Sequence, residues 1–288
     1  MSAIPSDVIR LAPNVPVFDL PIIVALERGL FRAQGIEVAF VARHDPVTSN
    51  QDAFKRQKES LYESGRADAY NLCEWAGLDR SDRSGRGSRV HALRPAVAAQ
   101  VILAFDRDIQ EPRDLAGVPV GINEFTGSHY TALQFLEGTL PREDIVLQHV
   151  GEPFLRYEQL KAGTLRAASL MEPYVSLALK EGAHIIAANF YRGAEVISPS
   201  LSPEQRQGYL AAVNAAADLI SADFASFKHH LIVEQIRHRI APHEIADHFV
   251  HYAHAKPLDP KRFAYTTEWM RSWNLAPRHD AFDELVVI

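Results

Sequence analysis

Residues 16–38, PVFDLPIIVALERGLFRAQGIEV, form the segment of this chain that says most about its fold. Apolar residues between 21 and 32 recur at helical spacing, and Gly29 lies where such a helix should end. An apolar run at 8–12 precedes the segment and another run covers 36–41, and both are typical of buried strands. The chain therefore opens with a strand–helix–strand unit, which predicts parallel strands covered by helices.

The same alternation of strand and helix continues to about residue 190. Further strands are expected at 67–72, 97–105, 118–122, 145–150, 167–171 and 185–189, and helices at 50–64, 128–137, 153–162 and 175–181. After Pro203 the strand pattern stops, and helices are expected at 203–220, 224–239, 242–255 and 260–273. The pattern predicts two α/β blocks and a helical C-terminal segment, with crossovers between the blocks near 97–105 and 195–197.

Several short motifs occur together in an order and spacing that is known from one superfamily. The first segment places Ala25, Gly29, Phe31, Gly35, Ile36 and Val38 in the pattern A-x-x-x-G-x-F-x-x-x-G-I/L-x-V, and the later motifs are SGRAD at 64–68, DLAGVPVG at 114–121, and Gly163 with MEPY at 171–174. Over most of residues 8–190 the chain resembles the superfamily of sulfonate- and nitrate-type ABC solute-binding proteins and THI5/NMT1-like thiamine-pyrimidine synthases.

This resemblance implies a two-lobed fold of the type II periplasmic-binding-protein class, with a ligand cleft between the lobes. We expect residues 1–100 and 195–288 to form lobe 1, and residues 101–194 to form lobe 2. The strands at 8–12 and 118–122 are expected to lie in separate sheets.

Charge and composition narrow the classes of function. The 288 residues carry a formal net charge of −6, which argues against non-specific nucleic-acid binding because that requires a basic face. Five arginines lie between Arg80 and Arg94, but Ser and Gly interrupt them, and we interpret this run as a solvated loop. No stretch approaches ~18 apolar residues, so no membrane span is expected. Residues 1–10 lack the basic start and apolar run of a secretory signal, which favours a cytoplasmic location.

Ligands of open α/β sheets bind beyond the carboxyl ends of the strands, and this rule selects segments 14–19, 71–75, 123–130 and 172–174. In the third segment a helix should open at 126–128, where free N–H groups favour an anion or a carbonyl oxygen. The alternative for these residues is a simple helix cap. The expected ligand-binding residues are Asn14, Phe18, Asp19, Asn71, Trp75, Thr126, Gly127, Ser128, Tyr130 and Tyr174. The aromatic members could stack on a flat ligand or serve only as packing.

Carboxylates and one imidazole also fall on these segments, namely Glu74, Glu124, Glu172 and His129. They can bind a cationic or N–H-rich ligand, hold a divalent metal, or perform general acid–base catalysis. The alternative is that each carboxylate is solvated or salt-bridged and that His129 packs on a helix surface. We expect at least three of the four to line one pocket. No cofactor is predicted, although a divalent metal would suit these side chains.

The enzymes of the resembling superfamily carry groups that this chain lacks. The pyrimidine synthases have a lysine and a histidine after the third strand, where this chain has Leu72 and Ala76. The aromatic sulfinate desulfinases use a cysteine after the first strand, where this chain has Val15. The single cysteine, Cys73, has no basic neighbour to lower its pKa, so a buried filler role is expected.

Three histidines, at 248, 251 and 254, share one face of the expected helix at 242–255, with Glu244 one turn earlier. A metal site or a solvated helix face would each explain that spacing.

Two classes of function remain. We favour a cytoplasmic enzyme of the lyase or hydrolase type, which binds a small molecule with a carboxylate, sulfonate or N-heterocyclic group. The alternative is a solute-binding component of an ABC importer, whose partner would be a membrane permease.

Overall fold

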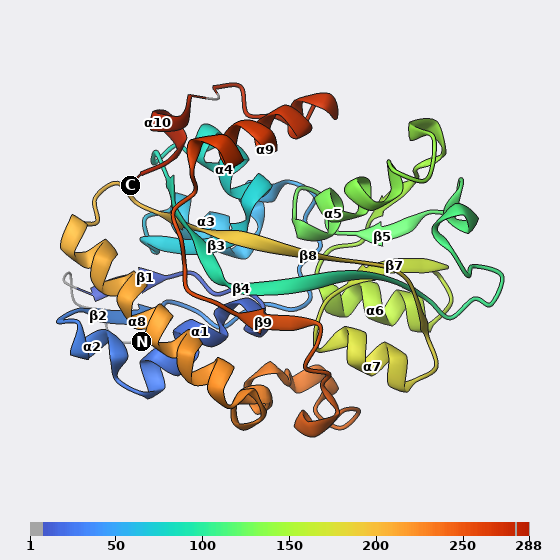
Figure 1. Cartoon of the computed structure of the whole chain (residues 1–288), viewed down its shortest axis with the longest axis horizontal. Coiled ribbons are helices and arrows are strands. Elements are labelled where there is room, and N and C mark those ends of the chain that lie inside the picture. Colours follow the sequence, from blue (N-terminus) through green and yellow to red (C-terminus); the bar gives the residue numbers. More distant parts are fainter. Residues whose placement is uncertain (1–7, 280, 288) are drawn as a thin grey trace.

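The computed structural model describes residues 8–279 and 281–287. The strands are β1 (Val8–Leu11), β2 (Glu37–Phe40), β3 (Ala69–Cys73), β4 (Arg89–Ala104), β5 (Val120–Ile122), β6 (Leu147–His149), β7 (Ala167–Leu170), β8 (His184–Ile197) and β9 (Val250–Tyr252). The α-helices are α1 (Pro16–Glu27), α2 (Leu30–Ala33), α3 (Gln57–Glu63), α4 (Glu74–Arg83), α5 (Gly127–Leu136), α6 (Pro153–Lys161), α7 (Tyr174–Lys180), α8 (Pro203–Ala222), α9 (Pro260–Ser272) and α10 (Phe282–Leu285). Figure 1 shows helices on both faces of the strands, with α4, α5 and α9 on one side and α1, α8, α6 and α7 on the other.

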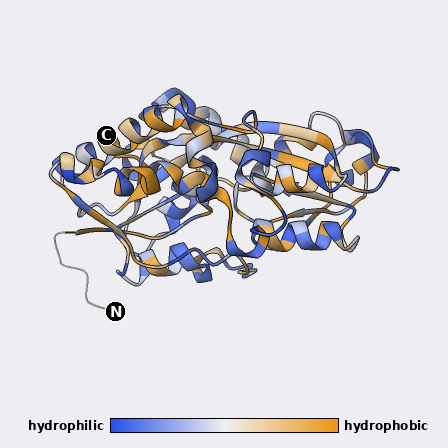
Figure 2. Cartoon of the chain, turned by 90° about the horizontal axis from the view of Figure 1, so that it is seen from below, coloured by the Kyte–Doolittle hydropathy of each residue, from blue (hydrophilic) through white to orange (hydrophobic). Residues whose placement is uncertain are grey.

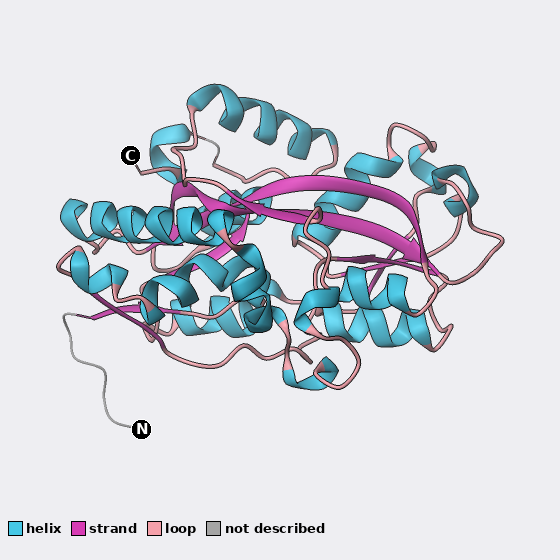
Figure 3. Ribbon diagram, turned by 60° about the horizontal axis from the view of Figure 1, so that its bottom comes forward, coloured by secondary structure: helices cyan, strands magenta, loops and turns pink. Residues whose placement is uncertain are grey.

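The strands follow the order β2-β1-β3-β8-β4-β7-β5-β6, and β9 pairs with β4. β1, β2 and β3 are parallel to one another, as are β5, β6 and β7. The two groups are joined by β4 and β8, an antiparallel pair of 16 and 14 residues that runs through both lobes (Figure 3). The α/β fold and its two lobes are therefore as expected.

The expectation of two separate sheets is wrong, because β1 and β5 belong to one continuous hydrogen-bonded sheet. Strands rise about 3.3 Å per residue, so β4 is roughly 50 Å long and reaches from one parallel group to the other. The lobe boundaries at 100/101 and 194/195 stay a prediction, and we use them below only to name the lobes. Figure 2 shows helices that carry both hydrophobic and hydrophilic residues, as expected where one face packs on the sheet.

The C-terminal segment differs from the expected row of helices. Only α8 and α9 form long helices, while 3-10 turns cover Phe224–Leu231, Glu234–Ile236 and Pro242–Glu244. The strand β9 replaces the expected helix at 242–255, because Val250 and Tyr252 are buried against β4 while His251 between them is exposed. That alternation has the period of a strand. The three histidines at 248, 251 and 254 therefore do not share a helix face, and the metal site considered for them is not formed.

The arginine run is not a solvated loop. α4 extends to Arg83 and β4 begins at Arg89, so only a short turn separates them. Arg80 and Arg94 are both completely buried, at 0% exposure.

Among the described helices, none by itself has the length and hydropathy of a membrane span, whereas α8 together with the bent segment Phe224–Leu231 reaches both.

Candidate functional site

A cavity of about 40 Å³, which we call the central cavity, lies at the carboxyl ends of β1, β3, β5 and β7. Residues of both lobes line it: Asn14, Val15, Phe18, Lys58, Leu72, Cys73, Arg94, Asn123, Thr126, Gly127, Glu152, Pro153, Arg156, Met171 and Tyr191. A smaller space of about 20 Å³ beside it shares Asn14, Lys58, Asn123, Thr126 and Glu152. A buried water occupies about 10–15 Å³ on this measure, so the central cavity has room for a compact head group of a few heavy atoms.

Arg94 is the most unusual residue of this cavity. Its guanidinium lies 3.6 Å above the centre of the Phe18 ring. One nitrogen, Nη1, donates to the carbonyl oxygen of Leu72 at 3.1 Å and more weakly to Asn71 Oδ1 at 3.3 Å. The other two, Nε and Nη2, are buried and make no well-formed hydrogen bond with the described residues, and the Tyr191 hydroxyl is the polar group that lies near the guanidinium. Position 193 on the neighbouring strand must be glycine, because a Cβ there would overlap the Arg94 guanidinium and the Leu72 carbonyl oxygen.

Two further cations line the same space. Lys58 donates from Nζ to Asn14 Oδ1 at 2.9 Å, and burial lowers the pKa of its ammonium group. Arg156 donates from Nε to the carbonyl oxygen of Ser169 at 2.8 Å, and burial lowers its pKa to about 10, so it stays charged at neutral pH. Glu152 is the carboxylate among the lining residues. Among the lining side chains three cations therefore face one carboxylate, while the buried carboxyl groups of Asp19 and Glu195 lie behind the wall and interact electrostatically with Arg94.

The start of α5 faces the central cavity. Thr126 and Gly127 line it, and a Cβ on Gly127 would lie 2.5 Å from the hydroxyl oxygen of Tyr191, so only glycine fits there. Ser128 is turned to its own backbone, since its Oγ accepts the N–H of Asn123 at 2.9 Å. The first N–H groups of a helix and its dipole favour an anion. The predicted helix start at 126–128 is therefore present.

A buried network of side chains holds the segment after β1 in place. The Asp19 carboxylate accepts the backbone N–H of Asn14 at 2.6 Å and the Nδ2–H of Asn71 at 2.7 Å. The side chain of Asn14 in turn donates to Asn71 Oδ1 at 2.6 Å. Burial raises the pKa of Asp19 to about 6 despite these bonds. Asn14 and Phe18 thus line the central cavity, while Asp19 and Asn71 support them from behind. α1 begins at Pro16, earlier than expected, so Phe18 and Asp19 lie in its first turn.

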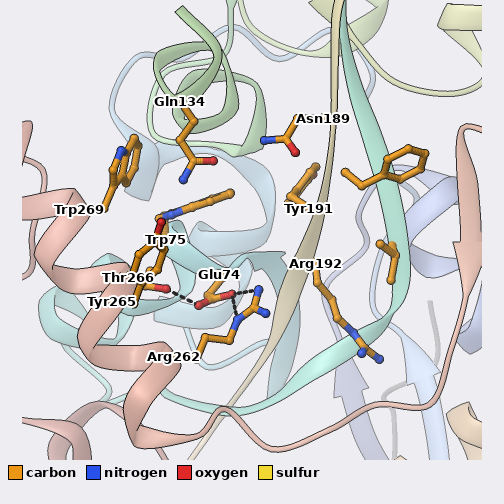
Figure 4. Close-up of a pocket in the computed structure, with 12 residues that line it drawn as sticks. Glu74, Trp75, Gln134, Asn189, Tyr191, Arg192, Arg262, Tyr265, Thr266 and Trp269 are labelled. Atoms are coloured by element: carbon orange, nitrogen blue, oxygen red, sulfur yellow. Dashed lines mark hydrogen bonds and ion pairs between the residues drawn. The ribbon is translucent and has the colours of Figure 1, made fainter. Parts of the chain in front are cut away.

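The remaining predicted ligand residues lie elsewhere. Tyr130 is fully buried and stacks on Trp75 at 5.5 Å between ring centres, and Tyr174 packs against Phe154 and Tyr157. Neither tyrosine lines the central cavity. Trp75 lines a different and larger cavity of about 440 Å³, together with Glu74 (Figure 4).

The four residues expected to act as a catalytic set do not come together, although Glu124 and His129 are near enough to interact electrostatically. Glu74 lines the larger cavity and is bound by Arg262, while Glu172 is buried behind the start of α7, where it accepts the N–H and O–H of Ser176. His129 lies within α5 and accepts the N–H of Phe125 on Nδ1.

Glu124 is half-buried and lines neither cavity, and its backbone carbonyl accepts from Arg56. The expectation that three of the four would line one pocket is therefore wrong. Each segment does follow a strand end, but the side chains turn toward different neighbours.

Acid–base and metal chemistry find little support in these positions. Burial lowers the pKa of His129 to about 4, so its ring is neutral at pH 7, and burial raises the pKa of Glu172 to about 7. Within the described residues, no group of three or more His, Cys, Asp or Glu side chains is placed to hold a metal ion. Cys73 does line the central cavity, but burial raises the pKa of its thiol to about 11, which leaves no thiolate to act as a nucleophile.

The charged residues of the central cavity, Lys58, Arg94, Glu152 and Arg156, were absent from the sequence-based prediction. One signal was available for Arg94. It interrupts the apolar run VHALRPAVAAQ at 90–100, and a charge inside such a strand is rarely buried unless it is paired or functional. The other three lie on helices or loops whose sequences do not distinguish them from surface charges.

Comparisons with known proteins agree with this architecture. No family model matches the sequence, and no curated protein matches it. The alkanesulfonate-binding protein SsuA from Xanthomonas axonopodis pv. citri, bound to MOPS, superposes with a TM-score of 0.76 at 16% identity, over 96% of each chain. The periplasmic aliphatic sulphonate binding protein SsuA from Escherichia coli gives 0.73 at 18% identity, over 98% of each.

The similarity extends to a protein with a different activity. The desulfurization enzyme DSZB superposes with a TM-score of 0.66 at 17% identity, over 98% of this chain and 96% of that one. At such low identities the likeness establishes architecture alone. The chain therefore has the two-lobed fold of the periplasmic binding proteins, as the sequence motifs led us to expect.

Proposed function

We propose that the protein binds a small organic anion between its lobes, with a sulfonate or carboxylate head group in the central cavity. The two unpaired nitrogens of buried Arg94 carry this proposal. A buried donor without a partner costs about 1–3 kcal/mol, so a protein rarely keeps two of them on one side chain without a use. A planar carboxylate, or two oxygens of a tetrahedral sulfonate, can accept from two guanidinium N–H groups at once.

The surroundings of Arg94 favour the same class of ligand. Lys58, Arg156 and the start of α5 add positive potential, and Glu152 is the opposing carboxylate among the lining residues. An anion would be attracted to this space, whereas a cation would be repelled by the positive charges of Lys58, Arg94 and Arg156. The N-heterocyclic ligand considered from the sequence has less support in the central cavity than the anion.

The biological role that best fits this chemistry is that of a solute-binding component of an ABC importer. Two solved structures of the same fold are described as sulfonate-binding proteins, one of them as periplasmic. In this role the partner would be a membrane permease, and the protein would work on the outer side of the membrane rather than in the cytoplasm.

The lyase or hydrolase hypothesis loses its main support. Glu124 interacts electrostatically with His129, but Glu172 lies apart from both, and the Cys73 thiol stays protonated at neutral pH. DSZB is an enzyme of the same fold, so turnover is measured in the test below.

A binding screen tests this proposal directly. Methanesulfonate, benzenesulfonate, acetate and benzoate are each titrated into the protein by isothermal calorimetry, with benzylamine as a cation of matched shape. At least one anion should bind and raise the melting temperature by roughly 5 °C at 100-fold excess over Kd, whereas benzylamine should not. Binding of benzylamine alone would overturn the proposal. If NMR spectra of the same sample show that the anion is consumed, the protein is an enzyme rather than a binding protein.

A further inference from the structure

The larger cavity, of about 440 Å³, is separate from the central cavity, and Tyr191 forms part of the wall of both. It lies where the start of α4, one side of α9, the last turn of α5 and the strand β8 meet (Figure 4). Small-molecule sites usually have volumes of about 300–1,000 Å³, mostly apolar walls and a few polar groups. The 440 Å³ cavity falls within this range, whereas the central cavity, at about 40 Å³, does not.

Aromatic rings form the walls of this second cavity. Trp75 is held in its plane by stacking on Tyr130 at 24° between the rings. Trp269 lies 6.0 Å from Trp75 between ring centres, and its indole N–H donates to Glu137 at 2.7 Å, so its ring is also fixed. Tyr265 at the rim is 72% exposed, unusually high for an aromatic side chain. Two fixed rings at an open space provide a surface on which a flat molecule can stack.

Two side-chain amides point into the same space. Figure 4 shows Gln134 reaching from α5 toward Trp75, and Asn189 reaching from β8 toward the space beside it. Neither amide has a hydrogen-bond partner within residues 8–279 and 281–287. Each offers two N–H donors and a carbonyl acceptor, so together they complement an edge that both donates and accepts.

The charges around the cavity compensate one another. The Glu74 carboxylate accepts from Arg262 at 2.6 Å and 2.8 Å and from the hydroxyl of Thr266 at 2.6 Å. Arg192 donates to the carbonyl oxygens of Arg94 and His254 and points away from the two amides (Figure 4). An anion in the cavity would be repelled by the Glu74 carboxylate, and a cation would be repelled by Arg262. The cavity therefore favours a neutral molecule, in contrast to the central cavity.

We infer that this second cavity binds a neutral, planar aromatic or heteroaromatic molecule with an amide-type edge. Trp75 and Trp269 are tilted by 59° to each other and contact each other, so the ring packs against the surface that they form together rather than between them, and the edge exchanges hydrogen bonds with Gln134 and Asn189. The site is independent of the anion site, because its contacts come from other residues. Tyr191, the one side chain shared by both walls, packs between the two ligands.

Benzamide is a suitable probe, because it is neutral and flat and carries one amide. Its binding is measured by calorimetry and by the indole N–H signals of the three tryptophans. The signals of Trp75 and Trp269 should shift, while that of Trp273, which does not line the cavity, should move least. Gln134→Leu and Asn189→Leu should each weaken binding roughly three- to tenfold, the usual contribution of one hydrogen bond. Gln207→Leu, an exposed position on α8, is the matched control and should bind as the wild type does.

The alternatives give distinct results. Failure of benzamide to shift the Trp75 and Trp269 signals of the unmodified protein would overturn the inference, whatever the variants do. Equal affinity in the wild type and both leucine variants would also overturn it. Saturating methanesulfonate should leave benzamide bound, and displacement would mean that both probes use the central cavity. The Arg94→Met protein should retain benzamide while losing the anion, so this inference and the anion proposal can fail separately.

Discussion

Replacing Arg94 by methionine should abolish anion binding while leaving the fold intact. A bound sulfonate or carboxylate would accept from Nε and Nη2, the two nitrogens that lack partners. Hydrogen bonds to charged groups contribute about 1.5–3 kcal/mol each, so their loss should cost about 3–6 kcal/mol of binding free energy. This corresponds to a roughly 10²- to 10⁴-fold increase in Kd for methanesulfonate, measured by calorimetry at pH 7.

The same substitution should have a small effect on the unliganded protein. It removes the bond to the Leu72 carbonyl and the contact with the Phe18 ring, which together contribute about 3–5 kcal/mol. It also removes two buried donors without partners, each of which costs about 1–3 kcal/mol. These terms nearly cancel, so the free energy of unfolding in urea should change by less than about 2 kcal/mol.

Two results would refute this reasoning. If the methionine variant binds methanesulfonate within threefold of the wild type, Arg94 does not hold the anion. If it loses more than about 4 kcal/mol of stability, Arg94 is a structural residue and its nitrogens are not waiting for a ligand. Arg32→Met is the control, because that side chain is 76% exposed and should alter neither quantity.

Three further substitutions test other features of the structure. Arg80→Met should lower the free energy of unfolding by about 3–5 kcal/mol, because the buried Glu59 would lose its partner, and an unchanged urea midpoint would contradict this. Since burial raises the pKa of Glu172 to about 7, the folded state binds this proton more tightly than the unfolded state, and stability should fall by about 3 kcal/mol as the pH rises from about 4.5 through 7. Burial also raises the pKa of Asp19 to about 6 and that of Glu195 to about 7, so Glu172→Gln should reduce rather than remove the slope in urea unfolding between pH 5 and pH 8, and an identical slope would rule out Glu172 as a contributor. Glu137→Ala removes the acceptor of two indole N–H groups, including that of Trp269, that tie α9 to lobe 2. It should shift tryptophan emission to the red and increase the radius of gyration, and no change in either would mean that α9 does not hold the lobes together.

Much of the fold follows from local sequence signals. Gly29 and Gly35 adopt positive φ angles of 67° and 72°, as their places at a helix end and before a strand suggested. The alternation of apolar runs located most of the strands and helices up to residue 190 to within a few residues. The helix start at 126–128 was also predictable, because the strand–glycine–serine pattern that forms it is local.

The chemistry of the central cavity was not predictable in the same way. Whether Arg94 is a surface charge or a buried ligand group depends on Asn71 and Leu72, more than twenty residues away in the chain. The dispersal of Glu74, His129 and Glu172 has the same origin, since each lies near a strand end but bonds to whichever neighbour the packing supplies.

The sequence by itself thus determined most of the strands and helices up to residue 190, because hydrophobic period and turn residues act over a few positions, and its motifs implied the two-lobed fold by resemblance. Only the tertiary structure decided that β4 and β8 join both lobes in one sheet, that β9 adds to it, and that three cations and a helix start surround one cavity. Strand pairing and the burial of charge depend on which distant segments meet, and no local pattern encodes that choice.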